Sequence, residues 1–229
     1  MYKYRPHDAI ETVLRPHDLL WITDVESLIS ELPLPAWASP EWLVAAPVVM
    51  RREQVDDAQW LPVGLRGQTR SERFKALLSV NAVAHCVPPE FLVSAEAWKL
   101  HGQYDVFPAV QALVNIAPLL NTMGLCWGPT GSVGFALASG LPVLHDASDL
   151  DLVVRASSPL PLATVKLLKT LLVSHLCRID MQIDTGNGGF AFAEWVSGRN
   201  SVLLKTNTGP ILTADPWAKI HQPPFRPIR

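Results

Sequence analysis

Two aspartates one residue apart are the part of this sequence most suited to chemistry. Asp149 and Asp151 stand in an alternating run with Leu150, Leu152 and Val154. Successive side chains of a strand point to opposite faces, so the apolar residues share one face and the aspartates share the other. Two carboxylates on one face repel each other unless a cation lies between them. The spacing therefore predicts a divalent-ion site, and Mg²⁺ suits it because this ion combines carboxylate ligands with substrate phosphates.

A glycine-rich segment precedes this pair. It contains Gly128, Gly131 and Gly134, with Ser132 among them. Glycine permits positive φ angles and close approach of a ligand, and such turns offer backbone N–H groups to phosphate oxygens. We therefore expect Gly131 and Ser132 to bind phosphate beside the predicted metal site.

A third carboxylate is expected from a second alternating run, residues 179–184. Asp180, Gln182 and Asp184 would share one face of this strand. Asp180 is preferred because a carboxylate in mid-strand is held more rigidly than Asp184, which adjoins a glycine-rich turn, but the sequence leaves the choice open. A phosphate-binding turn, a metal-binding pair and a third acidic residue together are typical of metal-assisted phosphoryl or nucleotidyl transfer. A D-x-D pair alone is also common on exposed strands, as a solvated edge or an N-cap for the next element.

Positive charge is densest over residues 66–75. The charged residues there are Arg66, Arg70, Arg73 and Lys75, opposed only by Glu72. Thr69 and Glu72 have the spacing of a capping box, which predicts that a helix begins here and ends before Pro88. Arginines beside a helix start could bind a polyphosphate, or they could form an ordinary solvated face. Lys205, at the end of a predicted strand, is a further candidate phosphate ligand or an exposed side chain.

The elements that must position these residues suggest an α/β or α+β protein with a mixed sheet and flanking helices. We expect a smaller N-terminal α+β domain over residues 1–86, with the basic helix start, and a catalytic domain over residues 90–229. In the second, helices are predicted from Val106 to Gly124, kinked near Pro118, and from an N-cap at Ser158. His17 beside Asp18 could be an oriented base, although such a pair is more often structural.

Composition limits the partners. The 229 residues carry 19 basic and 21 acidic side chains, a formal net charge of -2, so no global field would attract nucleic acid or an anionic membrane. The three cysteines lack the spacing of a zinc site or a disulfide framework, and no apolar run is long enough to span a bilayer. These features predict a cytoplasmic protein.

The Gly131-Ser132 turn followed by the D-x-D pair resembles the nucleotidyltransferase superfamily related to DNA polymerase β, although the intervening segment is longer here. A closer resemblance, to the malonate decarboxylase holo-acyl-carrier-protein synthase family of phosphoribosyl-dephospho-CoA transferases, covers most of the chain. The matching segments are Arg15–Trp21, Val48–Arg52, Pro62–Gly67 with Arg70 and Arg73, Gly128–Phe135, Ser148–Leu152, Asp180–Gln182, Ala193–Trp195 and Leu204–Thr206.

The resemblance implies that the group is transferred from a triphosphoribosyl-dephospho-CoA precursor to a serine of the apo acyl-carrier subunit, with loss of pyrophosphate. It also implies that Asp149 and Asp151 are the catalytic signature. Two other interpretations stay open: a nucleotidyltransferase acting on a small molecule or a different protein, and a non-catalytic binding subunit that keeps the fold.

Overall fold

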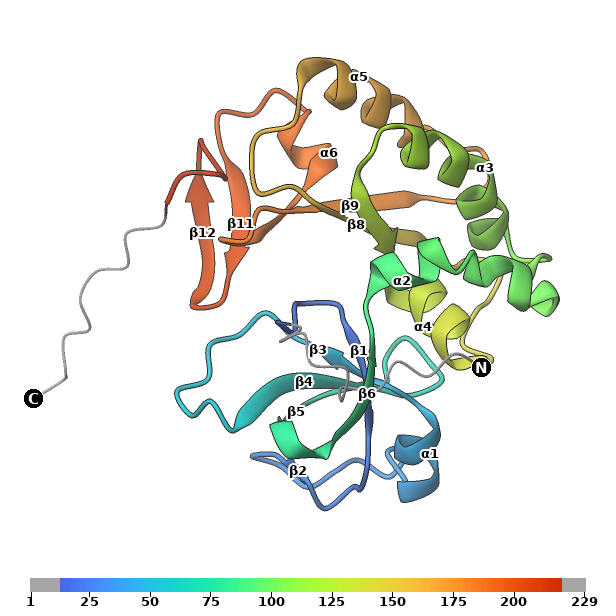
Figure 1. The fold of residues 1–229 in the computed structure, drawn as a ribbon, viewed down its shortest axis with the longest axis vertical. Helices are drawn as coiled ribbons and strands as arrows, with labels where there is room; N and C mark the ends of the chain where they lie inside the picture. Colours follow the sequence, from blue (N-terminus) through green and yellow to red (C-terminus); the bar gives the residue numbers. More distant parts are fainter. Residues whose placement is uncertain (1–12, 220–229) are drawn as a thin grey trace, which may run out of the picture.

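The computed structural model describes residues 13–219, which are organised around two β-sheets of six strands each (Figure 1). The strands of the first sheet all come from residues before 88, and those of the second from residues after 125. The outer limits of the two predicted domains, residues 1 and 229, lie outside the described range. The second sheet is mixed, since β8 and β9 run parallel and its other neighbours antiparallel. The predicted α+β class is confirmed.

The first sheet is antiparallel throughout. In spatial order its strands are β2 (Leu28–Ile29), β5 (Arg73–Ser79), β4 (Trp60–Arg66), β3 (Val48–Met50), β1 (Leu19–Ile22) and β6 (Val83–Val87). Helix α1 (Pro40–Ala45) and the short 3₁₀ helix η1 (Val80–Ala82) complete this half. One face of the sheet buries alternate apolar residues, among them Leu20, Val63 and Leu78, in a core of its own.

The basic helix predicted to begin at Thr69 and end before Pro88 is wrong, because residues up to Ser79 form the turn and second strand of the β4–β5 hairpin and are followed by η1 and β6. The Thr69 and Glu72 pair does form a local contact, in which the Thr69 backbone N–H donates to the Glu72 carboxylate at 2.8 Å. This contact closes the turn, helped by the Gly67 N–H, which donates to the Glu72 carbonyl at 3.0 Å. The two residues with capping-box spacing therefore stabilise a hairpin turn here and not a helix start.

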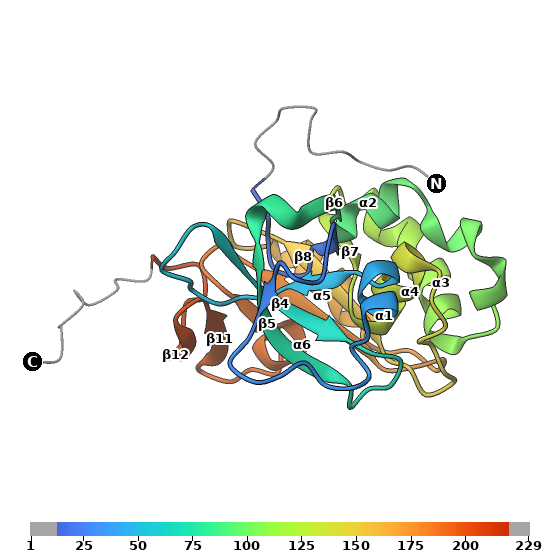
Figure 2. The same cartoon turned by 90° about the horizontal axis from the view of Figure 1, so that it is seen from below.

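The second sheet positions the D-x-D pair. In spatial order its strands are β12 (Gly209–Thr213), β11 (Val202–Thr206), β10 (Gly189–Ala191), β9 (Ile179–Asp184), β8 (Leu150–Arg155) and β7 (Cys126–Pro129). Its helical elements are α2 (Pro89–Ser94), η2 (Ala97–Leu100), η3 (Gly102–Tyr104), α3 (Pro108–Thr122), α4 (Gly131–Ser139), α5 (Leu162–Leu171) and α6 (Phe192–Trp195). Figure 2 shows α2, α3 and α4 together at one end of the molecule and β11–β12 at the other.

Two helix predictions have different outcomes. The helix expected from Val106 to Gly124 is confirmed as α3, with Pro118 inside it and Gly124 at a φ of 64° just beyond its end. The N-cap expected at Ser158 is wrong, because α5 begins four residues later, after Pro161. A proline at 159 and another at 161 keep the chain extended before the helix starts.

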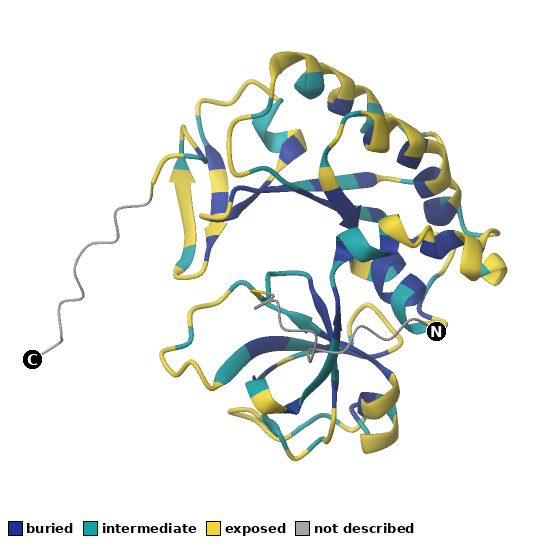
Figure 3. Cartoon of the chain, viewed as in Figure 1, coloured by how far each residue is buried: buried dark blue, intermediate teal, exposed yellow. Residues whose placement is uncertain are grey.

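The two sheets face each other across the middle of the molecule. In Figure 1, α3, α5 and α6 lie on the outer side of the second sheet, and the first sheet lies on its inner side. Leu150, Leu152 and Val154 of β8 are buried in the hydrophobic core that the second sheet shares with its helices. Figure 3 shows buried residues concentrated in the middle strands of this sheet and exposed residues on the outer sides of the helices. The residues that alternate with these three on β8 therefore face the first sheet.

Between residues 13 and 219, none of the helices is both long and apolar enough to cross a membrane.

Candidate active site

The D-x-D pair lies at the start of β8. Asp149 directly precedes this strand and Asp151 is its second residue, while Leu150 and Leu152 are buried on the other face. Asp151 is half-buried, and burial raises its pKa to about 6, with further contributions from the charges of Asp180 and Asp149. Carboxylates affect one another in this way only when they are close, so three acidic side chains gather at this point.

The register of β9 against β8 separates the two candidates for the third carboxylate. Asp180 pairs with Asp151, whereas Asp184 pairs with Arg155. The two positions on β9 are four residues apart, which is roughly 13 Å along a strand. Asp180 is therefore the one beside the D-x-D pair. Its carboxylate accepts a hydrogen bond from Arg178 Nε at 3.0 Å.

The glycine-rich segment runs from the end of β7 through Thr130 into the first turn of α4, and it touches Asp151 directly. The Thr130 backbone N–H donates to the Asp151 carbonyl at 2.8 Å. Gly131, the first residue of α4, has a φ of 57°, and a Cβ on it would lie 1.9 Å from Asp151 Oδ2. Thr130 occupies the N-cap position without a side-chain hydrogen bond to the helix. The N-terminal end of α4 therefore presents backbone N–H groups next to the carboxylates.

The hairpin of the first sheet brings arginines to the same place. Arg66 is only 5% exposed, its Nη2 donates to Ser132 Oγ at 2.6 Å, and its guanidinium carbon lies 5.1 Å from the centre of the Phe135 ring. Burial lowers the pKa of Arg66 to about 10, and nearby Arg73 adds to this shift, so the side chain stays charged at neutral pH. Arg70 and Arg73 are exposed at the turn, and both charges act on the site. Burial and the charge of Arg70 lower the pKa of Arg73, and the Asp151 carboxylate opposes that shift. The charge of Arg70 in turn offsets part of the raised pKa of Asp151.

A cavity of about 430 Å³ lies between the two sheets beside this group. The first sheet contributes Leu19, Val49, Gly64, Arg66 and Arg73, and the second half contributes Leu92, Phe135 and residues 129–131. Its walls are thus largely apolar, with four basic side chains among them, Arg51, Arg66, Arg73 and Lys75, and the α4 N-terminus at Gly131. This arrangement suits a ligand that joins an apolar group to phosphates.

The residues at the D-x-D pair fit a magnesium ion that is shared with a substrate. Within residues 13–219, no three His, Cys, Asp or Glu side chains are placed to hold a metal by themselves. Asp149 and Asp151 supply two carboxylates, and the raised pKa of Asp151 reflects burial first and then the negative charges of Asp180 and Asp149, which Arg66 and Arg70 do not fully offset. One or two carboxylates completed by phosphate oxygens and water are a usual set of ligands for Mg²⁺.

Asp184 and Lys205 lie at the other end of the sheet. Asp184 is buried and forms ion pairs with Arg52 at 2.9 Å and with Arg155. Burial alone would favour the neutral acid, but Arg52, the Gly186 N–H and Arg155 hold the pKa of Asp184 below its usual value. Lys205 on β11 pairs with Gly189 on β10, which in turn pairs with Asp184 on β9, so Lys205 lies at the same height in the sheet as Asp184. The structure therefore does not bring Lys205 together with Gly131 and Ser132.

His17 and Asp18 also lie between the sheets, at this second end. His17 has a φ of 77°, and its Nε2 lies 3.0 Å from Nε2 of Gln182 on β9. Burial, with the charges of Arg155 and Arg52, lowers the pKa of His17 to about 4. Asp18 is 1% exposed, and burial raises its pKa to about 6. The pair thus belongs to the contact between the two halves.

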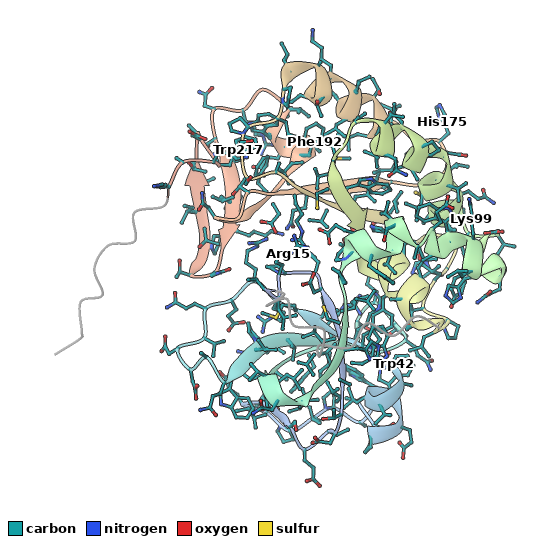
Figure 4. The ribbon with its side chains drawn as sticks, in the orientation of Figure 1. Arg15, Trp42, Lys99, His175, Phe192 and Trp217 are labelled. Carbon is teal, nitrogen blue, oxygen red and sulfur yellow. The ribbon has the colours of Figure 1, made fainter. Side chains whose placement is uncertain are left out.

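Sequence reasoning missed the centre of this contact, Arg155. Its Nε donates to Glu90 at 2.9 Å and its Nη2 donates to the Pro16 carbonyl at 2.9 Å, in addition to the pair with Asp184. Arg15 completes the group through a 3.1 Å bond to Glu90, and Figure 4 shows it in the space between the sheets. The sequence did point to Arg155, because it lies four residues after Asp151 and on the same face of an otherwise apolar strand.

Comparison with known proteins finds two family models. Residues 15–89 match the model described as the phosphoribosyl-dephospho-CoA transferase MdcG N-terminal domain, and residues 99–216 match that of the C-terminal domain. No solved structure matches the chain.

Curated relatives match over nearly their whole length. A phosphoribosyl-dephospho-CoA transferase of Pseudomonas putida is 42% identical over 92% of this chain and 98% of its own. Proteins with the same name are 43% identical in Klebsiella pneumoniae, over 89% of this chain and 96% of their own, and 36% identical in Pseudomonas syringae pv. tomato, over 90% and 94%.

Proposed function

Because the chain belongs to the phosphoribosyl-dephospho-CoA transferase family, we propose that it loads the acyl-carrier subunit of malonate decarboxylase with its prosthetic group. The donor is triphosphoribosyl-dephospho-CoA, the acceptor is a serine of the apo carrier, and pyrophosphate is released. The family relationship establishes a transferase; the acceptor, the leaving group and the mechanism are the proposal.

The chemistry is an in-line displacement at phosphorus. The serine Oγ forms a bond to the phosphorus next to the ribosyl group, and the bond from this phosphorus to the bridging oxygen of the terminal two phosphates breaks. Pyrophosphate leaves with the electron pair. The serine proton passes to a carboxylate, for which Asp180 is the candidate because it lies level with Asp151 on the neighbouring strand.

The chain's own residues hold the phosphates from two sides. The N–H groups at the start of α4, at Gly131 and Ser132, face the phosphates from the second half, and Arg66, Arg70 and Arg73 face them from the first. Lys205 lies too far along the sheet to share this role. Asp149 and Asp151 would hold Mg²⁺, which would neutralise phosphate charge as the displacement proceeds.

The observation that carries the proposal is the convergence of Asp151, Gly131 and Arg66 from three separate elements on one point. Intact-mass spectrometry of the apo carrier, incubated with the enzyme, the donor and Mg²⁺, tests it. We expect the carrier to gain the mass of one phosphoribosyl-dephospho-CoA group. Labelling of another acceptor by an ordinary nucleoside triphosphate, with no change in the carrier, would favour a different nucleotidyltransferase; no modification under any condition would favour a binding subunit.

A further inference from the structure

One position on the inner face of the first sheet has no side chain, because it is a glycine. Gly64 on β4 pairs with Val49 on β3 and with Lys75 on β5, and all three line the cavity. Residues paired across strands point to the same face, so the glycine leaves an opening between the two longer side chains. A glycine inside a strand weakens it and often marks a place where a ligand approaches the backbone.

Packing within the protein does not explain this glycine. A Cβ on Gly64 would have its nearest neighbours in the Arg51 side chain, at 3.5 and 3.6 Å, which is ordinary contact. Gly131, by contrast, has no room for a Cβ. A methyl group would therefore fit at Gly64 against the Arg51 side chain, and its absence leaves the β4 backbone open to the cavity at this point.

The surroundings of the opening favour a flat apolar group. Leu19 and Val49 lie on one side of the cavity and Leu92 and Phe135 on the other, and the aliphatic stems of Arg51 and Lys75 border the glycine. The cavity continues to Gly131, which touches Asp151. A group placed here would be attached to phosphates held at the α4 N-terminus.

We propose that the opening at Gly64 receives the adenine base of the dephospho-CoA part of the donor. This inference rests on the proposed function. It assigns the N-terminal sheet a role in that function, which is recognition of the donor. Adenine is planar and rigid, so it can lie against the exposed backbone of β4 without losing internal freedom. The pantetheine arm would have to give up many rotatable bonds to fill the same space.

Filling the opening tests the inference. We would measure binding of dephospho-CoA by calorimetry, without a carrier, and then of its two halves, AMP and 4′-phosphopantetheine. Val at position 64 suits a strand, so Gly64→Val should fold, and Gly64→Ala provides a smaller step. Ser79→Val adds the same branched side chain to β5 outside the cavity and is the matched control.

We expect Gly64→Val to weaken binding of dephospho-CoA and AMP by at least about tenfold, Gly64→Ala to weaken it less, and Ser79→Val to leave it unchanged. Equal binding of AMP by wild type and a folded Gly64→Val protein would overturn the inference and leave the proposed function intact. So would a loss confined to 4′-phosphopantetheine, since the cavity would then hold the arm. Failure of the wild type to bind dephospho-CoA would count against the proposed function itself.

Discussion

At the scale of single residues, the site depends on the absence of a side chain at Gly131. This residue combines a φ of 57° with an Asp151 carboxylate that lies where a Cβ would be. Any side chain would push the carboxylate away from the α4 N-terminus. The position of Asp151 is therefore set by the glycine turn as well as by β8.

Gly131→Ala should lower the rate of carrier modification by at least about 100-fold, because the new methyl group would occupy the position of Asp151 Oδ2. Gly140→Ala is the matched control at the other end of α4. Gly140 also has a positive φ, 73°, but a Cβ there meets only His101, at 3.6 Å. The control should lose about 1 kcal/mol of stability and keep its activity. If both variants were equally active, Gly131 would have no special role.

At the scale of elements, the β4–β5 hairpin is what places positive charge opposite Asp151. Arg66 ends β4 and pairs with Arg73 at the start of β5, so both face the second sheet together. A helix over the same residues would have spread these charges around its axis. The hairpin thus explains why a separate N-terminal sheet takes part in the site.

Arg66→Lys should raise the KM for the donor about tenfold with a smaller change in kcat. Lysine keeps the charge but loses the planar group that donates to Ser132 while stacking on Phe135. Arg199→Lys is the control and should leave both constants unchanged, because Arg199 is exposed and its ion pair with Glu194 is long, at 3.8 Å. Steady-state kinetics with intact-mass detection would distinguish the two.

The sequence predicted the elements of the second sheet better than those of the first. The strand at 179–184 and the helix around Pro118 have clear periods of two and 3.6, and both are present. Residues 69–79 offered a local capping signal, but pairing with β4 overrode it. The D-x-D pair could be located because its alternation is local. The contact between Arg66 and Ser132 could not be predicted, because 66 residues separate them in the sequence.

At the scale of the whole molecule, a buried group of charges joins the two sheets at the end away from the D-x-D pair. Arg155 lies at its centre, with Glu90, Asp184 and the Pro16 carbonyl around its guanidinium. Because Arg155 and Asp151 are on one strand, this contact also fixes the orientation of β8, and with it Asp151, relative to the first sheet. Such long-range pairing leaves no local pattern in the sequence.

Arg155→Met should lower the free energy of unfolding by about 3–5 kcal/mol, because it leaves Asp184 and Glu90 partly buried with less compensation. Urea denaturation would measure the loss. Arg199→Met removes an exposed arginine and should change stability by less than about 0.5 kcal/mol. Equal effects of the two substitutions would show that the Arg155 contacts contribute nothing specific.

His17 should make stability depend on pH. Its pKa of about 4 lies below the unfolded value of about 6.5, so the neutral form stabilises the fold above pH 6.5, and this contribution is lost as the pH falls towards 4. Arg155, Arg52 and Lys205 oppose its protonation, and Asp184 favours it.

His17→Asn keeps a residue type that tolerates a positive φ and removes the titrating ring. Between pH 7.5 and pH 5, wild type should lose about 2 kcal/mol of unfolding free energy relative to this variant. The raised pKa of Asp18 acts in the opposite direction and is present in both proteins, so the difference isolates His17. A constant difference over this range would contradict the assignment.

The central claim is that Asp149 and Asp151 hold a divalent ion against the donor phosphates. Electron paramagnetic resonance with Mn²⁺ in place of Mg²⁺, in the presence of the donor and without the carrier, tests this most directly. Wild type should bind Mn²⁺ tightly, and Asp149→Asn and Asp151→Asn should each bind it at least about tenfold more weakly while staying folded. Mn²⁺ binding of equal strength in all three proteins would contradict the claim.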